Sequence, residues 1–144
     1  MIYVNSIMNS LYTTLSSNST LVNSNVTVEM AEPLNSDPNK LPWVGVYYNG
    51  SEIVPRRIGG STPWQATHDL RIYVEDQSHL DSQTANDNLQ KLLFPVLAAV
   101  NSNRTLDGTI LHMTDISVEP FELNIEEEGN FFVYEIIISG ENEA

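Results

Sequence analysis

The histidines are the first residues to test for chemistry, because the chain contains no cysteine. They are His68, His79 and His112, and no two of them have the i, i+4 spacing of a helical metal-binding pair. His68 lies on the apolar side of an alternating stretch, where a hydrogen-bonded core histidine is commoner than a metal ligand. Asp69 follows it and in a strand points to the opposite face, which argues against a local dyad or metal site.

Other catalytic motifs are incomplete. No serine stands in a Gly-x-Ser-x-Gly elbow. The stretch Gly59-Gly60-Ser61-Thr62 lacks the lysine and the following helix of a phosphate-binding loop. The acidic run Glu126, Glu127 and Glu128 lacks the alternating ligands of an EF-hand loop, so a solvated turn is favoured over a calcium site. We therefore expect no enzyme, and no catalytic, cofactor or metal site.

Size and charge restrict the class of protein further. The chain has 144 residues and a net charge of −13, from 6 basic and 19 acidic residues, and we expect one domain over residues 1–144. Such a chain is a poor nonspecific ligand for nucleic acid or for an anionic membrane surface. It has no run of 18 apolar residues and no recognisable signal peptide, so we expect neither a membrane span nor secretion.

The N-terminal stretch is unusual because it carries no charged side chain before Glu29, although Ser, Thr and Asn are abundant there. Uncharged polar groups cost less to desolvate than charges do. The stretch therefore suits burial against another subunit, and compositional drift is the equally weighted alternative.

Apolar periodicity predicts the elements that position these residues. In the first half of the chain we expect a helix over Ile2–Leu15, a strand or loop at Val26–Val28, a connector over Pro33–Pro42 and strands over Trp43–Tyr48 and Trp64–Val74, of which the second alternates. A helix from Ser78 or Asp81 to Val100, with Pro95 inside it, should follow. The last part should contain a strand over Thr109–Val118, a break at Pro120, a short strand over Phe121–Ile125, a turn at Glu126–Asn130, a last strand over Phe131–Ser139 and a frayed tail over Gly140–Ala144. This order predicts an α+β fold, in which a single layer of mostly antiparallel sheet, with about four to five strands, packs with two main helices.

The segment Asn49–Pro63 separates two expected strands and is longer than an ordinary hairpin loop. We expect it to form a mobile arm. It contains the adjacent Arg56 and Arg57, followed by Ile58, Gly59 and Gly60. Arginine pairs well with carboxylates at interfaces, so the acidic surface of another copy is a plausible partner for the arm. The simpler alternative is a flexible loop that its two charges keep soluble.

The layout of these segments resembles a known family. The segment Leu41-Pro42-Trp43-Val44-Gly45-Val46-Tyr47 precedes a long arm, an alternating strand and a long helix. Asn103-Arg104-Thr105-Leu106-Asp107-Gly108 then precedes the closing strands. Over Ile2–Ser139 this arrangement is similar to the tail terminator, or tail completion, proteins of long-tailed bacteriophages.

The resemblance implies a structural virion protein that forms a six-membered ring at the head-proximal end of the tail, assembled in the host bacterial cytoplasm. Such a ring caps the tail tube, stops its polymerisation and offers the head-joining surface. The implied partners are other copies of the chain, the tail tube protein and a head–tail connector, with DNA passing through the ring without specific binding. Arg56 and Arg57 would be the charged contacts of the arm, and Asp69, Glu126, Glu127 and Glu128 are candidates for the lumen or an interface.

Two alternatives stay open at this point. Head–tail connectors and neck adaptors of bacteriophages also assemble as rings and share an α+β build. A non-viral acidic module that binds other proteins is the second alternative, and its only support is the acidic surface.

Overall fold

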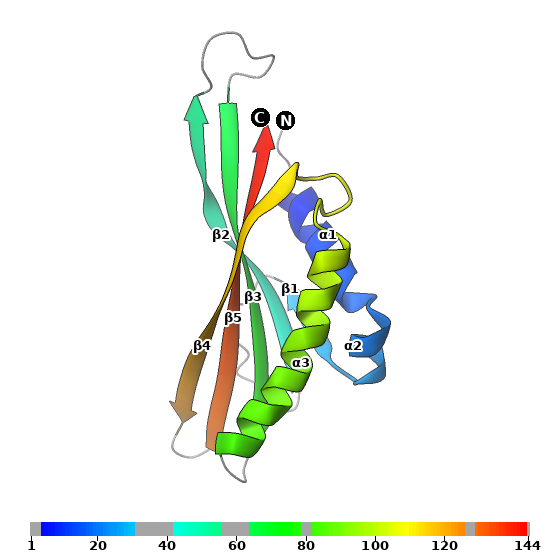
Figure 1. The fold of residues 1–144 in the computed structure, drawn as a ribbon, viewed down its shortest axis with the longest axis vertical. Helices are drawn as coiled ribbons and strands as arrows, with labels where there is room; N and C mark the ends of the chain where they lie inside the picture. The colour runs from blue at the N-terminus through cyan, green and yellow to red at the C-terminus, as the bar shows by residue number, and fades with distance from the viewer. Residues whose placement is uncertain (1–3, 31–41, 56–63, 79–81, 126–128, 144) are drawn as a thin grey trace.

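The computed structural model describes residues 4–30, 42–55, 64–78, 82–125 and 129–143. Its elements are α1 (Val4–Ser16), α2 (Ser19–Asn23), β1 (Thr27–Met30), β2 (Trp43–Pro55), β3 (Trp64–Ser78), α3 (Ser82–Ser102), β4 (His112–Ile125) and β5 (Gly129–Glu143). The strands form one sheet of five in the order β1-β2-β3-β5-β4. The helices lie on one side of this twisted sheet, and the other side has no helix over it (Figure 1). The predicted α+β fold is therefore confirmed.

The sheet is antiparallel except at one edge. The pairs β2–β3, β3–β5 and β4–β5 are antiparallel, whereas β1 runs parallel to β2. A parallel neighbour needs a crossover connection, and the residues between β1 and β2 provide its length. β5 lies between β3 and β4, so it is an interior strand of the sheet.

The core lies between the helices and the facing side of the sheet. The alternation predicted for β3 is confirmed, because every second residue from Ala66 to Val74 is buried. The core side chains come from both layers: Ile7, Met8, Leu11 and Leu15 of α1, Leu92, Leu93, Val96 and Val100 of α3, and Val44, Val46, Leu70, Ile72, Val74, Ile136 and Ile138 of the sheet. Full burial of one such side chain contributes about 1.5–3 kcal/mol, so these contacts account for the docking of the helices.

The segment after α3 ties the two main helices together. Leu106, Asp107 and Gly108 have positive φ angles of 47°, 59° and 82°, as the Asp-Gly turn signal suggests. The Asn103 amide donates to Thr14 Oγ1 of α1 at 2.8 Å, and Ser10 Oγ donates to Asp107 Oδ2 at 2.6 Å. The Asn-Arg-Thr-Leu-Asp-Gly segment, the most specific piece of the resemblance, therefore has a structural role in this chain.

Four strands are longer than expected, and one of them is β3, which continues past Val74 to Ser78. Asn49–Pro55 belongs to β2 rather than to an arm, because Ser51–Pro55 pairs with β3 beyond a bulge between Tyr48 and Ser51. The break expected at Pro120 is wrong, because β4 continues through this residue. β4 is an edge strand of the described sheet, and on its outer side a proline removes no hydrogen bond between strands. The expected frayed tail is wrong up to Glu143, since Gly140–Glu143 pairs with β3.

Other expectations meet the structure in part. The possible strand at Val26–Val28 is realised as β1, which runs from Thr27 to Met30. The short helix α2 was not expected; Asn18 caps it by accepting from the backbone N–H of Leu21 at 3.2 Å. Most of the connector Pro33–Pro42, the predicted helix cap Asp81 and residues 56–63 lie outside the described residues. The other predicted cap, Ser78, is the last residue of β3, and the described part of α3 begins at Ser82, so a helix start at Ser78 is wrong.

Candidate functional site on the open face of the sheet

We define the open face as the side of the sheet that no helix covers. On β3 it carries the residues that alternate with the buried ones, including Thr67, Asp69, Arg71 and Tyr73. The register adds the open-face residues of the neighbouring strands, because directly opposed residues in an antiparallel pair share a face. The acidic residues with a described side chain and register on this face are Glu29, Glu52, Asp69, Glu75, Asp115, Glu119, Glu135 and Glu141, of which Glu75 is buried.

Arg71 is the centre of this face. Its guanidinium donates to both carboxylate oxygens of Asp69, at 2.7 and 2.8 Å, and to Glu135 Oε1 of β5 at 2.7 Å. Asp69 also accepts from the Asn49 amide of β2 at 2.9 Å. One network therefore joins β2, β3 and β5 across the open face.

The network fixes the charge of its members. The hydrogen bond from Arg71 lowers the pKa of Asp69, and the same contact raises the pKa of Arg71. Burial and a hydrogen bond to Glu135 raise the pKa of Tyr73 to about 12. Asp69 is thus an anion and Tyr73 a neutral phenol at neutral pH, whereas a general acid or base needs a pKa near the working pH. The arrangement supplies fixed negative charge rather than proton transfer.

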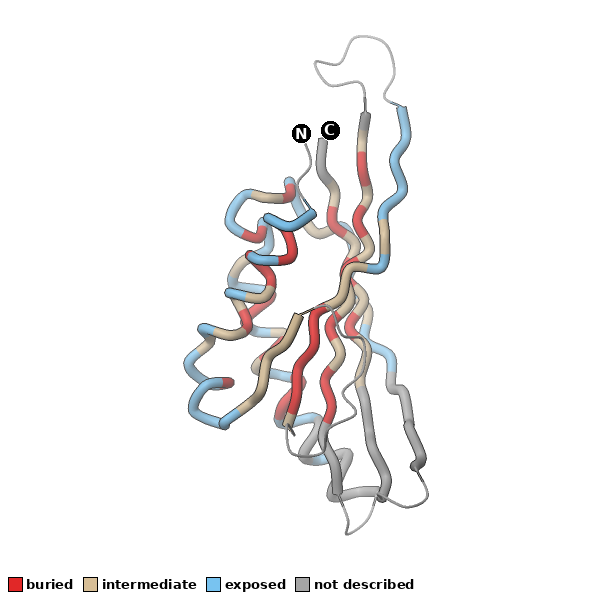
Figure 2. Tube along the Cα trace, turned by 180° about the vertical axis from the view of Figure 1, so that it is seen from behind, coloured by how far each residue is buried: buried red, intermediate tan, exposed pale blue. Residues whose placement is uncertain are grey.

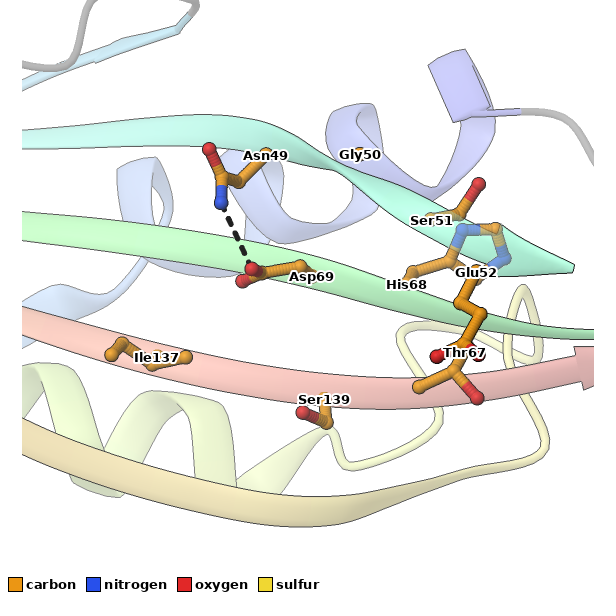
Figure 3. Close-up of a pocket in the computed structure, with 9 residues that line it drawn as sticks. All are labelled: Asn49, Gly50, Ser51, Glu52, Thr67, His68, Asp69, Ile137 and Ser139. Carbon is orange, nitrogen blue, oxygen red and sulfur yellow. Dashed lines mark hydrogen bonds between the residues drawn. The ribbon is translucent and has the colours of Figure 1, made fainter.

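A shallow hollow of about 320 Å³ lies where β2 bulges beside β3. Its lining residues are Asn49, Gly50, Ser51, Glu52, Thr67, His68, Asp69, Ile137 and Ser139. Figure 3 shows the Asn49–Asp69 hydrogen bond on one side of it and Glu52 beside Thr67 on the other. No Lys or Arg lines the hollow beside the two acids at its rim, so the hollow continues the acidic character of the open face.

The open face has little positive charge. Among the described residues, Arg71 is the only Lys or Arg on it, since Lys91 lies on α3 and Arg104 in the segment that follows α3. His112 Nε2 lies 3.0 Å from Glu141 Oε2. The face therefore presents more carboxylates than cations, and it is the largest concentration of charge on the described sheet.

The structure places the predicted site residues as follows. Asp69 is on the open face, as its position in an alternating strand predicts. The arm residues Arg56, Arg57, Ile58, Gly59 and Gly60 and the acids Glu126, Glu127 and Glu128 lie outside the described residues, so the roles assigned to them stay predictions. Sequence analysis missed the partnership of Arg71 with Glu135, which depends on the register of β3 and β5 and has no local signal.

The histidines do not form a site in the described part of the chain. His68 is buried, as predicted for a core histidine, and its Nδ1 lies 2.8 Å from the Tyr48 hydroxyl. His112 is exposed on β4, and His79 is outside the described residues. No group of three potential metal ligands occurs among the described residues, and no helix there is long and apolar enough to cross a bilayer.

Comparisons with known proteins find similarity only among solved structures, where 29 chains match. No protein-family model matches the chain, and no curated protein matches it. A chain in the virion of a native gene transfer agent particle is similar over 95% of this chain and 94% of that chain, with a TM-score of 0.48 and 14% sequence identity. A similarity at this level does not identify the function of the chain.

Proposed function

We propose that the chain is a structural virion protein of the tail terminator class, which forms a ring of six copies at the head-proximal end of a phage tail. The ring would cap the tail tube, stop its polymerisation and present the joining surface to a head–tail connector. The order of strands, arm and helix from Leu41 to Gly108 suggests this class. The main support for the proposal is the acidic face of the sheet that no described helix covers.

The open face is the surface that we assign to the lumen of the ring. DNA must pass through this lumen without binding, and a surface rich in carboxylates repels phosphate. Six copies with a charge of −13 each carry about −78 in total, so a ring of this protein has a strongly negative field. Arg71 does not reverse that field, because Asp69 and Glu135 already hold its guanidinium.

The arm is the second part of the proposal. Arg56 and Arg57 follow β2 directly in the sequence, and the acidic body of a neighbouring copy is the surface that they would contact. We expect the double substitution Arg56→Glu with Arg57→Glu to weaken assembly and to leave the monomer folded. Sedimentation velocity at constant ionic strength measures the assembly, and unchanged assembly would remove the arm from the mechanism.

Electron microscopy of particles produced without this gene tests the role itself. Overlong tails without heads are the expected result, because polymerisation of the tube would have lost its stop. Tails of normal length beside unjoined heads would instead assign the protein to the connector class. Normal virions would contradict both roles.

A further inference from the structure

Besides the short strand β1 at one end of the sheet, two strand edges of the described sheet have no described partner. β1 pairs with β2 only from Trp43 to Val46, so no described strand flanks the outer side of β2 beyond that point. The distal end of β2, Ser51–Pro55, is exposed at every residue, and it projects past the helices (Figures 1 and 2). β4 is the other edge, and it pairs only with β5 in the described sheet. Unpaired backbone groups on a strand edge are a template for pairing with another chain.

Both edges carry exposed apolar side chains on the same side of the sheet. Ile53 is opposite the buried Ala66, so it is on the helix side of the sheet, and it is 54% exposed. Ile116 and Val118 are opposite Ile138 and Ile136 of the core, which puts them on the helix side as well, and they are 38% and 37% exposed. If one edge joined the other, apolar side chains would meet on that side.

Strand direction also permits this junction. β3 is antiparallel to β2, β5 to β3, and β4 to β5, so β4 runs antiparallel to β2 within one copy. If two copies have the same orientation and the sheet of one continues from β4 into β2 of the next, these two strands are therefore antiparallel to each other. β1 does not obstruct this contact, because its pairing ends at Val46, before the distal end of β2 begins.

We infer that the distal end of β2 in one copy pairs with β4 of a second copy of this chain. One chain carries both halves of the contact, and the halves differ, so the contact is heterologous and repeats around a ring. Pairing would cover the two apolar edges and supply backbone partners to both strands. This inference rests on the proposed ring and specifies which surfaces join its subunits.

Disulfide trapping tests the pairing, and the absence of native cysteine gives a clean background. Ile53→Cys and Val118→Cys are made separately, with Ile116→Cys as a second probe for the register. The purified full-length variants are mixed in pairs and oxidised mildly. We expect cross-linked dimers from Ile53→Cys with at least one β4 variant, at least tenfold above the control pair. The double variant Ile53→Cys/Val118→Cys or Ile53→Cys/Ile116→Cys should give a ladder of longer oligomers.

The control pair combines Ile53→Cys with Phe94→Cys, since Phe94 is also exposed, at 65%, but lies on α3. Circular dichroism of each variant checks that it folds. Efficient dimers of Ile53→Cys alone would overturn the inference in favour of two identical β2 edges. An oligomer in sedimentation velocity without the expected cross-link would overturn the inference and leave the ring intact. A monomer in sedimentation velocity that gives no cross-link would also overturn the inference. The gene-deletion experiment would then test the terminator role separately.

Discussion

Replacement of Arg71 by methionine is the sharpest test of the open-face network. Methionine keeps an unbranched stem of similar reach and removes the guanidinium, so Asp69 and Glu135 both lose their cation. Exposed ion pairs contribute about 0–1 kcal/mol, and hydrogen bonds to charged groups contribute about 1.5–3 kcal/mol. The three side chains are between 20% and 33% exposed, which places each contact between these limits.

Allowing for solvent screening, we assign a contribution of about 1 kcal/mol to the contact of Arg71 with each carboxylate. Loss of both contacts then lowers the free energy of unfolding by about 2 kcal/mol. For a chain of this size that loss lowers the Tm by roughly 4–8 °C. Urea unfolding followed by circular dichroism measures it at pH 7. Arg104→Met is the matched control, because Arg104 is exposed and its described hydrogen bonds go to the neutral Asn101 side chain.

The pH dependence separates the ion pairs from packing. Arg71 lowers the pKa of Asp69 in the folded protein. A lowered folded pKa contributes stability above the unfolded pKa, and the contribution is lost as the pH falls through the folded value. The difference between wild type and Arg71→Met should therefore persist from neutral pH to about pH 4 and shrink below it. A loss no larger than that of Arg104→Met at pH 7 would refute the assignment of stability to this network.

Two further substitutions test the packing and the buried histidine. Gly45→Ala should destabilise by about 1–3 kcal/mol or more, because an added Cβ would lie 2.7 Å from Cζ2 and Cζ3 of the buried Trp43 ring. Gly140→Ala should cost less, because its Cβ would come no nearer than 3.0 Å to the flexible Ile110 side chain, and equal losses in urea unfolding would contradict this view. Burial lowers the pKa of His68, so the folded state resists its protonation and stability should fall as the pH drops below 6.5. His68→Phe should flatten this fall between pH 6.5 and 5, and identical pH profiles of wild type and His68→Phe would refute it.

Sequence patterns predicted the helices and strands that bury an apolar face. They missed the ends of β2 and β5, which bury little apolar surface. β3 and the core residues of α1 follow clear apolar periods, and both appear as expected. Ser51–Pro55 and Gly140–Glu143 have little or no buried apolar residue to reveal them, yet backbone pairing with β3 makes both of them strand. Their stability comes from the ladder and from the neighbouring strand, neither of which leaves a period in the local sequence.

The candidate site was likewise predicted only in part. Alternation alone placed Asp69 on the polar face and His68 in the core. The partners of Asp69 could be named only in part, since Glu135 lies 64 residues from Arg71 in the sequence and comes beside it through the β3–β5 register. Long-range register is set by the whole sheet, so a single sequence does not specify which charges meet.

The distribution of charge restricts how copies of this protein can meet. An open face with more carboxylates than cations cannot be buried against a second copy of itself, because like charges would lose water and gain no partner. The described surface of α1 and α2 carries no charged side chain at all, and the helix-side edges of β2 and β4 present Ile53, Ile116 and Val118. Association through these uncharged surfaces leaves the open face in contact with water. In a ring, that requirement turns the acidic face towards the lumen or the outside and keeps it out of the joints between sheet edges. The acidic surface that Arg56 and Arg57 of a neighbouring copy would contact is then still exposed. The ring proposal and the edge pairing are consistent with each other for this reason, although each can fail by itself.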